Sequence, residues 1–116
     1  MKLKVETIIQ ALESRKIPFV HTNKFSKDSF VIKNPYAIEI FNKLPIGSKI
    51  VRITGERWGQ HAIFQGMNGS YDEIRLRWID PETNVIGSEC GGWQCIYFIP
   101  LSWIQTNTKS YQPDWL

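Results

Sequence analysis

The 116-residue sequence predicts an α+β protein, in which an N-terminal helix–hairpin–helix segment packs on a C-terminal five-stranded β-barrel. Apolar residues recur with helical spacing before residue 45 and alternate with polar residues at period two after Gly47. Hydrophobic residues make up 42% of the chain and aromatic residues 13%, which is enough for a packed core and excludes intrinsic disorder. We therefore expect a subdomain over 1–45, a barrel over 46–105 and a loosely ordered tail over 106–116.

Residues 4–15 are predicted to form an amphipathic helix. The apolar side chains lie three and four positions apart, as one side of a helix requires, and are Val5, Ile8, Ile9 and Leu12. Arg15 and Lys16 would lie in the last turn, where positive charge suits the helix dipole. Pro18 excludes further helix.

A hairpin and a second helix complete the first 45 residues. Aromatic and β-branched residues at 17–21 and 29–33 predict two short strands joined by a polar loop. Asn34 as the cap and Pro35 at the first helical position predict the start of a helix that Pro45 ends.

The remaining chain predicts five strands with short connections. They are expected at 48–54, 60–65, 72–79, 84–88 and 94–99. Turn signals separate them, among them Asn68-Gly69 and Asp80-Pro81, and Gly91-Gly92 is expected to break the chain before the last strand. Short strands with tight turns are typical of a small β-barrel.

Residues 47–64 resemble the KOW-type motif of SH3-like barrels. The shared pattern is a glycine turn, a β-branched strand, a loop bounded by Gly55 and Gly59, and a second strand, with a departure at Ala62, where the family usually has glycine. Residues 97–104 are similar to the strand, short helical turn and final strand of the same barrels. The resemblance implies an SH3-like barrel that acts as a non-catalytic binding domain, since members of this group contact ribosomal RNA, transcription machinery or protein partners.

The charge of the chain is unevenly distributed. The formal net charge is +3, but residues 1–52 carry ten basic and four acidic residues, whereas residues 53–116 carry four basic and seven acidic residues. Such polarity favours a surface for nucleic acid or for an acidic protein. The alternative is that the lysines only solubilise the helices.

Outward-facing arginines and a loop tryptophan form the candidate binding site. Its members are Arg52, Arg57, Trp58, His61, Arg75 and Arg77, and Lys24 and Lys27 would extend it as a basic stripe. Arginines bind phosphates and aromatic rings stack on bases, so we expect a small non-enzymatic module that contacts RNA or DNA, alone or within a nucleoprotein complex.

Two other interpretations use the same residues. Trp and Arg are also favoured protein-interface anchors, so the chain could be an adaptor or an inhibitor of a nucleic-acid-handling enzyme, of phage or mobile-element origin, that binds an acidic protein surface. In the structural alternative, Arg75 and Arg77 pair across strands with Glu73 or Glu56, and Trp58 covers the barrel.

No pattern for catalysis or metal binding stands out. The two histidines and two cysteines (His21, His61, Cys90 and Cys95) do not have the spacing of common zinc ligand sets. No nucleophile has a base nearby in the sequence and no phosphate-loop fingerprint occurs, so a small hydrolase stays only a residual alternative. We expect no catalytic residue, metal or cofactor, and two free thiols.

The sequence also predicts the cellular compartment of the protein. No apolar run approaches the roughly 18–20 residues needed to span a bilayer. Glu6, Thr7 and Gln10 interrupt the apolar core that a signal peptide would need. We therefore expect a cytoplasmic protein with no membrane partner.

Overall fold

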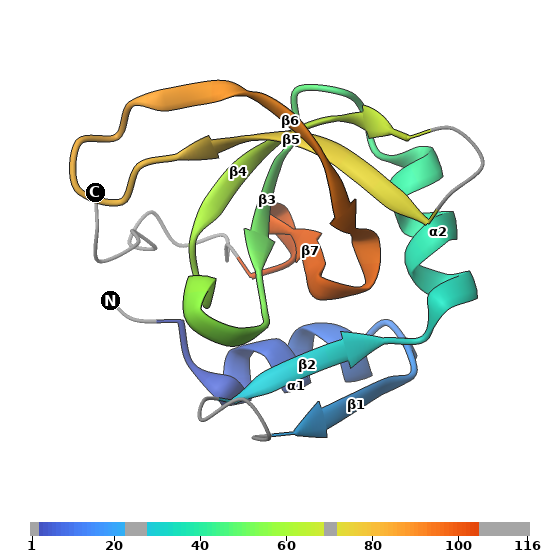
Figure 1. The fold of residues 1–116 in the computed structure, drawn as a ribbon. Coiled ribbons are helices and arrows are strands. Elements are labelled where there is room, and N and C mark those ends of the chain that lie inside the picture. The colour runs from blue at the N-terminus through green and yellow to red at the C-terminus, as the bar shows by residue number, and fades with distance from the viewer. Residues whose placement is uncertain (1–2, 23–27, 69–71, 105–116) are drawn as a thin grey trace.

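The computed structural model describes residues 3–22, 28–68 and 72–104, and it has a mixed α+β fold. Two helices accompany a five-stranded antiparallel sheet and a separate two-stranded hairpin (Figure 1). The predicted α+β class is confirmed. None of the described helices is both long and apolar enough to cross a membrane.

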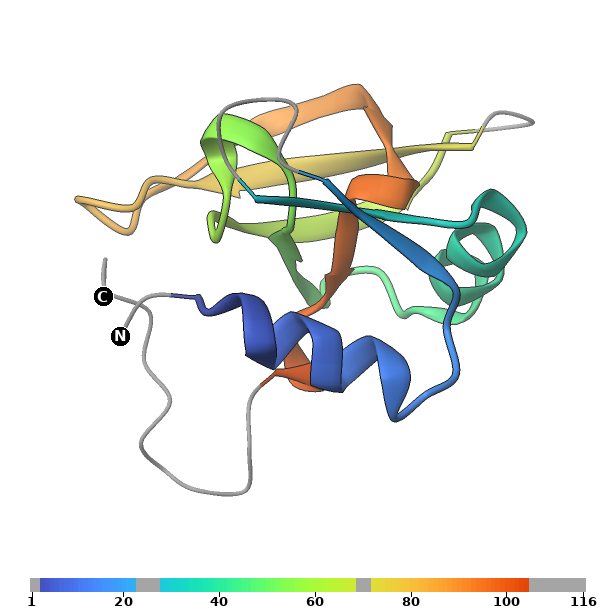
Figure 2. The same cartoon turned by 90° about the horizontal axis from the view of Figure 1, so that it is seen from below.

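The N-terminal part contains helix α1 (Val5–Glu13), strands β1 (Phe19–Thr22) and β2 (Ser29–Ile32), and helix α2 (Asn34–Lys43). Strands β1 and β2 pair in antiparallel fashion. Helix α2 has Pro in its first turn, but Lys33 rather than Asn34 precedes it and no side chain caps it, so the predicted role of Asn34 is wrong. Figure 2 shows α1 lying across the molecule on the side turned to the viewer.

The main sheet is formed by β3 (Lys49–Arg52), β4 (His61–Met67), β5 (Glu73–Ile79), β6 (Ile86–Gln94) and β7 (Phe98–Pro100). Their order is β6-β5-β4-β3-β7, so β6 and β7 lie at opposite edges and do not pair. The strand pattern predicted a closed or half-closed barrel, and the closed form is therefore wrong. A physical reason is that β7 has only three residues and ends in a proline, which has no N–H to donate to another strand.

The predicted break at Gly91-Gly92 is also wrong, because β6 continues through both glycines to Gln94. Ile74 pairs with Trp93 and Leu76 with Cys90, so β6 has one more residue than β5 over this stretch. This is a β-bulge, and the φ of +84° at Gly92 suits the residue type that adopts it without strain.

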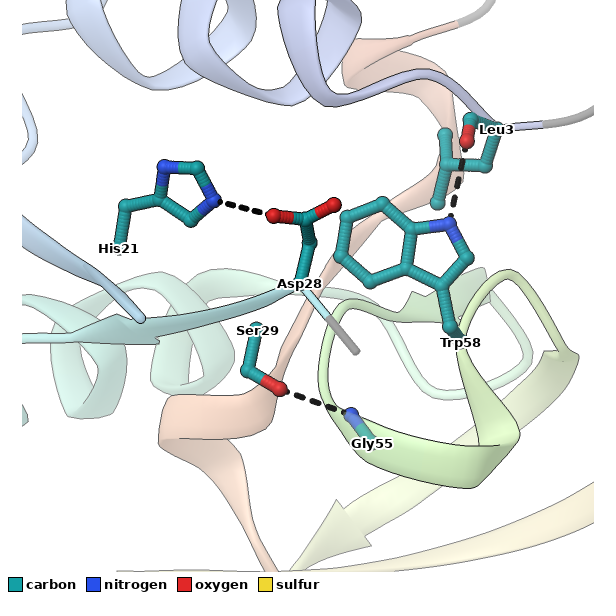
Figure 3. Close-up of polar contacts among 6 residues, drawn as sticks. All are labelled: Leu3, His21, Asp28, Ser29, Gly55 and Trp58. Atoms are coloured by element: carbon teal, nitrogen blue, oxygen red, sulfur yellow. Dashed lines mark hydrogen bonds and ion pairs between the residues drawn. The ribbon is translucent and has the colours of Figure 1, made fainter. Parts of the chain in front are cut away.

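One hydrophobic core holds side chains from both halves of the chain, among them Ile8, Phe30, Phe41, Phe64 and Phe98. Three hydrogen bonds, one of them between backbone groups, join the hairpin to the residues after β3. The Phe30 N–H donates to the Ile53 carbonyl at 2.9 Å, and the Thr54 hydroxyl donates to the Phe30 carbonyl at 3.0 Å. The N–H of Gly55 donates to the Ser29 hydroxyl at 3.0 Å (Figure 3). These bonds place β2 against the loop between β3 and β4.

A lysine occupies the position after α1 that usually holds glycine. The Ile17 N–H donates to the Leu12 carbonyl at 3.0 Å and the Lys16 N–H donates to the Glu13 carbonyl at 3.0 Å. These two bonds form a Schellman motif, in which the residue at the Lys16 position takes a left-handed conformation. Lys16 has φ +56°, which strains a residue that carries a Cβ atom.

We expect Lys16→Gly to raise the free energy of unfolding by about 0.5–1 kcal/mol, because relief of the strain exceeds the entropy that glycine loses on folding. Urea unfolding would measure this change. Lys16→Ala keeps the Cβ atom and should leave stability unchanged, which separates strain from charge. Destabilisation by Lys16→Gly would contradict the prediction.

Candidate binding site: an arginine–aromatic cluster

The structure distributes the predicted arginines over two sides of the sheet. Side chains alternate along β5, so the exposed Arg75 and Arg77 lie on the side opposite Leu76 and Trp78. The guanidinium of Arg57, by contrast, lies with its Cζ 4.5 Å from the centre of the Trp78 ring. The expected single surface through all these residues is therefore not formed.

Arg75 and Arg77 both contact β6. The Arg77 Nε donates to the Gly87 carbonyl at 2.7 Å. The Nη1 of Arg75 lies 4.0 Å from the Glu89 carboxylate, in a solvent-exposed pair. The Arg75 contact is a pair with an acid across strands, as in the structural alternative, but the acid is Glu89 and not Glu73 or Glu56, and exposed pairs of this kind contribute little to stability. Arg77 contacts a backbone carbonyl instead of an acid.

Trp58 is half-buried and packs against the core. Its indole Nε1 donates to the Leu3 carbonyl at 3.1 Å, and its ring centre lies 5.9 Å from that of Phe30. Figure 3 shows the indole directed toward Leu3, near the His21–Asp28 pair on the hairpin. The tryptophan thus holds the N-terminal segment and the hairpin together.

His61 is buried, with 2% of its surface exposed, so its predicted contact with a partner is wrong. Burial, with a smaller effect of the Lys49 charge, lowers the pKa of His61 to about 4. The imidazole is therefore neutral at physiological pH. Lys24 and Lys27, the other predicted members of the site, lie outside the described residues.

Arg52 and Arg57 instead meet in a group that we call the arginine–aromatic cluster, formed by Arg52, Arg57, Trp78, Trp93, Tyr97 and Phe98. The Cζ of Arg57 lies 4.5 Å from the Trp78 ring centre and 5.6 Å from that of Trp93. The Cζ of Arg52 lies 4.9 Å from the ring centre of Tyr97 and 5.0 Å from that of Phe98. These distances are those of cation–π contacts.

The aromatic rings of the cluster also pack on one another. Trp78 and Trp93 meet edge to face with ring centres 5.1 Å apart, and Trp78 lies 5.8 Å from Phe98. Strand β5 contributes Trp78 and β6 contributes Trp93, while Phe98 is the first residue of β7. Trp93 on β6 and Phe98 on β7 thus both contact Trp78, which brings the two edge strands of the open sheet together at this ring. Arg52 at the end of β3 and Arg57 in the following loop lie over the rings of the cluster.

The positive charge of the cluster is not neutralised by a described carboxylate: none forms an ion pair with Arg52 or Arg57 within the ranges that the structure describes. The Nε of Arg52 donates to the Thr54 carbonyl at 3.2 Å, and the Nη1 of Arg57 donates to the Gln60 side-chain oxygen at 3.1 Å. Burial lowers the pKa of Arg52, Tyr97 opposes this change and Arg57 adds to it. Arginine nevertheless stays protonated at neutral pH.

Two buried N–H donors of the cluster have no acceptor among the described residues. They are the Nη1 of Arg52 and the Nε1 of Trp78. Buried donors are normally paired, because an unpaired one costs about 1–3 kcal/mol of desolvation. The cluster therefore combines two cations with two unpaired donors beneath its surface, and its positive charge suits an anionic ligand.

Sequence reasoning identified Arg52 and Arg57 but missed the tryptophans beneath them. Trp78 falls on the inward side of β5 in the alternation, which predicts a core residue. Trp93 follows two glycines, which was the one signal that it could be exposed. No local pattern shows that the short helical turn Gly55–Arg57 brings an arginine over both rings.

The two cysteines lie in different environments. Both are free thiols, and Cys90 accepts a hydrogen bond from the Trp93 Nε1 at 3.3 Å. Burial, with a smaller effect of Asp72, raises the pKa of Cys95 to about 11, so its reactive thiolate is scarce at neutral pH. Within the described ranges, no three residues of the types His, Cys, Asp and Glu are grouped so that they could hold a metal ion.

No family model, curated protein or solved structure matches this chain.

Proposed function

We propose that this protein is a small non-enzymatic module that binds RNA or DNA through the arginine–aromatic cluster. The observation that carries the proposal is the presence of two guanidinium groups over four aromatic rings with no described carboxylate paired to either. Cationic side chains interleaved with aromatic rings are what single-stranded nucleic acid requires, because phosphates need positive charge and bases need a planar group on which to stack.

The two arginines would have different roles in such a complex. Arg57 is exposed and would contact a phosphate directly, while its contact with Trp78 limits the conformations that it must give up on binding. Arg52 is half-buried between Tyr97, Phe98 and the Thr54 carbonyl, so it would add a fixed positive charge beneath the ligand. Charge in a partly buried position is less screened by salt than charge at the surface.

An SH3-like relationship is the finer part of the proposal. The last strand, β7, pairs with β3, the first strand of the main sheet, and a short helical turn, Cys95–Tyr97, precedes it. Gly55 and Gly59 have φ of +66° and +82°, as the resemblance of residues 47–64 to a KOW-type motif requires of that loop. These features support the relationship although the sheet is open, and with it a binding role.

The test is the binding of labelled single-stranded RNA, single-stranded DNA and duplex DNA at about 50 and 200 mM salt, a range over which phosphate contacts weaken strongly. Arg57→Ala is expected to weaken binding about tenfold, as loss of one charged hydrogen bond does. The slope of log affinity against log salt should fall by about one.

The matched control is the double variant Arg75→Ala/Arg77→Ala, which removes more charge but from the other side of β5. If this variant affects only long-range electrostatics, its nucleic-acid affinity should stay within about fivefold of that of the unaltered chain. The affinity should also fall no further than it does in Arg57→Ala. A fall in slope of about two in this variant, with Arg57→Ala unchanged, would place the contact on the outer side instead. No salt-dependent binding at the lower concentration would refute the nucleic-acid proposal.

A second candidate is a protein-binding adaptor or inhibitor, and the outer edge of β6 favours it. Among the described strands, β6 pairs with β5 alone; its first residue, Ile86, is 44% exposed, and Val85 just before it is 61% exposed. A long exposed edge can accept a strand from a partner protein. Binding of a purified partner that persists at salt concentrations that abolish nucleic-acid binding, and that Ile86→Lys abolishes, would support this candidate over the first.

A further inference from the structure

We propose a second binding site, for an acidic peptide segment of a partner protein that carries a large apolar side chain. The site is a groove of about 450 Å³ between the end of α1, the exposed side of α2 and the residues after β7. It shares no residue with the arginine–aromatic cluster, so the two sites can be tested separately.

The floor of the groove is apolar. Ile17, Ile40, Leu44 and Pro100 line it, and the first three are only half-buried. Two aromatic side chains, Tyr36 and Trp103, complete the wall, and Tyr36 is 45% exposed. Half-buried aliphatic and aromatic side chains around a concave surface are what an apolar anchor of a peptide needs.

The charged residues around this floor are mainly positive. Arg15, Lys16 and Lys43 line the groove with a single acid, Glu39, which pairs with Lys43 at 3.1 Å. Two positive charges are thus in excess. An acidic peptide complements this arrangement, since its apolar side chain would enter the floor while its carboxylates meet the rim.

Arg15 is held in place before any ligand binds. Its Nη1 donates to the Ala11 carbonyl at 3.0 Å, and its Cζ lies 4.5 Å from the centre of the Trp103 ring. A guanidinium fixed in this way loses little conformational entropy on binding a carboxylate. The apolar floor and the acid on the rim favour a peptide over a nucleic acid, whose phosphates need a continuous positive surface.

Lys16 supplies an independent observation. It occupies the left-handed position after α1, with φ +56°, where glycine would be less strained. The strained residue is thus one whose side chain lines the groove. A strained residue at a cleft is a recognised sign of a functional position.

The experiment begins with a random heptapeptide library displayed on phage and selected against the full chain. We expect enrichment of peptides with one Leu, Phe or Trp flanked by Asp or Glu. The most enriched peptide, synthesised with a fluorescent label, is then titrated by fluorescence polarisation. Lys16→Gly combined with Lys43→Gln is expected to weaken its binding about tenfold, because each exposed charge pair contributes a factor of about three.

Two further variants define the result. Glu39→Gln should strengthen binding about threefold because it removes the acid from the rim. Lys49→Gln removes an exposed charge from β3, away from the groove, and should change the affinity by less than about twofold. The nucleic-acid affinity of all these variants should stay within about twofold of that of the unaltered chain, since the cluster is unaltered.

Three outcomes would overturn the proposal. The first is a selection without acidic enrichment, and the second is equal weakening by Lys49→Gln and by the double variant. The third is a gain of about tenfold in peptide affinity in Trp115→Ala, because the chain's own acidic and apolar segment Asp114–Leu116 would then be the occupant of the groove. Because Lys16→Gly is expected to stabilise the fold, loss of binding in the double variant is not explained by unfolding if its urea midpoint is retained.

Discussion

Trp58→Ala is expected to lower the free energy of unfolding by about 3 kcal/mol while leaving nucleic-acid affinity unchanged. The ring is half-buried against Phe30, with ring centres 5.9 Å apart, and its Nε1 donates to the Leu3 carbonyl at 3.1 Å. Truncation removes contacts that join Leu3, just before α1, to the hairpin and to the loop after β3. Urea unfolding gives the stability, and titration with labelled single-stranded RNA, under conditions where the variant is folded, gives the affinity.

The matched variant is Trp58→Phe, which keeps an aromatic ring against Phe30 but removes the indole donor. It should cost about 1 kcal/mol, as loss of a single hydrogen bond does. The opposite pattern for Trp58→Ala, with stability retained and affinity reduced, would restore the interpretation of Trp58 as a base-stacking residue.

Stability is expected to fall by about 3 kcal/mol through His61 as the pH is lowered from 7 to 4. The side chain is 2% exposed, and its pKa is about 4 instead of the ordinary 6.5. The unfolded chain binds a proton at this residue below pH 6.5, whereas the folded chain does so only below about pH 4. The contribution of His61 is therefore complete above pH 6.5 and is lost as the pH falls from 6.5 to 4.

Urea unfolding at a series of pH values, with His61→Gln as the control, isolates this effect. Other groups titrate in the same window, so the informative quantity is the difference in slope between the two proteins. Asp80 is one of these groups, because backbone hydrogen bonds from Thr83 and Glu82 lower its pKa from 3.8, and its effect is the same in both proteins and cancels in the difference. Equal slopes would show that His61 is not kept neutral by burial.

Local patterns in the sequence predicted most of the secondary structure. The helical spacing of Val5 to Leu12 predicted α1, and the alternation over 72–79 predicted β5 to within one residue. Both signals depend on neighbouring residues alone, since a helix or strand buries one side at a fixed period. The sequence pattern was less informative where backbone and bulge geometry decided the outcome, as at Gly92, where β6 continues through a predicted break.

The candidate binding site could likewise be predicted only in part from the sequence. Arg52 and Arg57 were found from the sequence, because arginine on a strand beside a glycine-bounded loop is a local feature. The same reasoning grouped them with Arg75 and Arg77, which the structure places on the opposite side of β5 from Trp78, and it did not foresee the ring contacts of Arg57.

By itself, then, the sequence predicted the α+β class, strands β1 to β5 and the presence of arginines near an aromatic loop. Only the tertiary structure decided that the sheet stays open, that His61 and Trp58 pack inward, and that Arg57 lies over Trp78 and Trp93. The reason is physical: periodicity states which side chains share one side of a strand, but not what covers that side. Covering depends on packing between segments far apart in the chain, such as the loop after β3 and the two edge strands of the sheet.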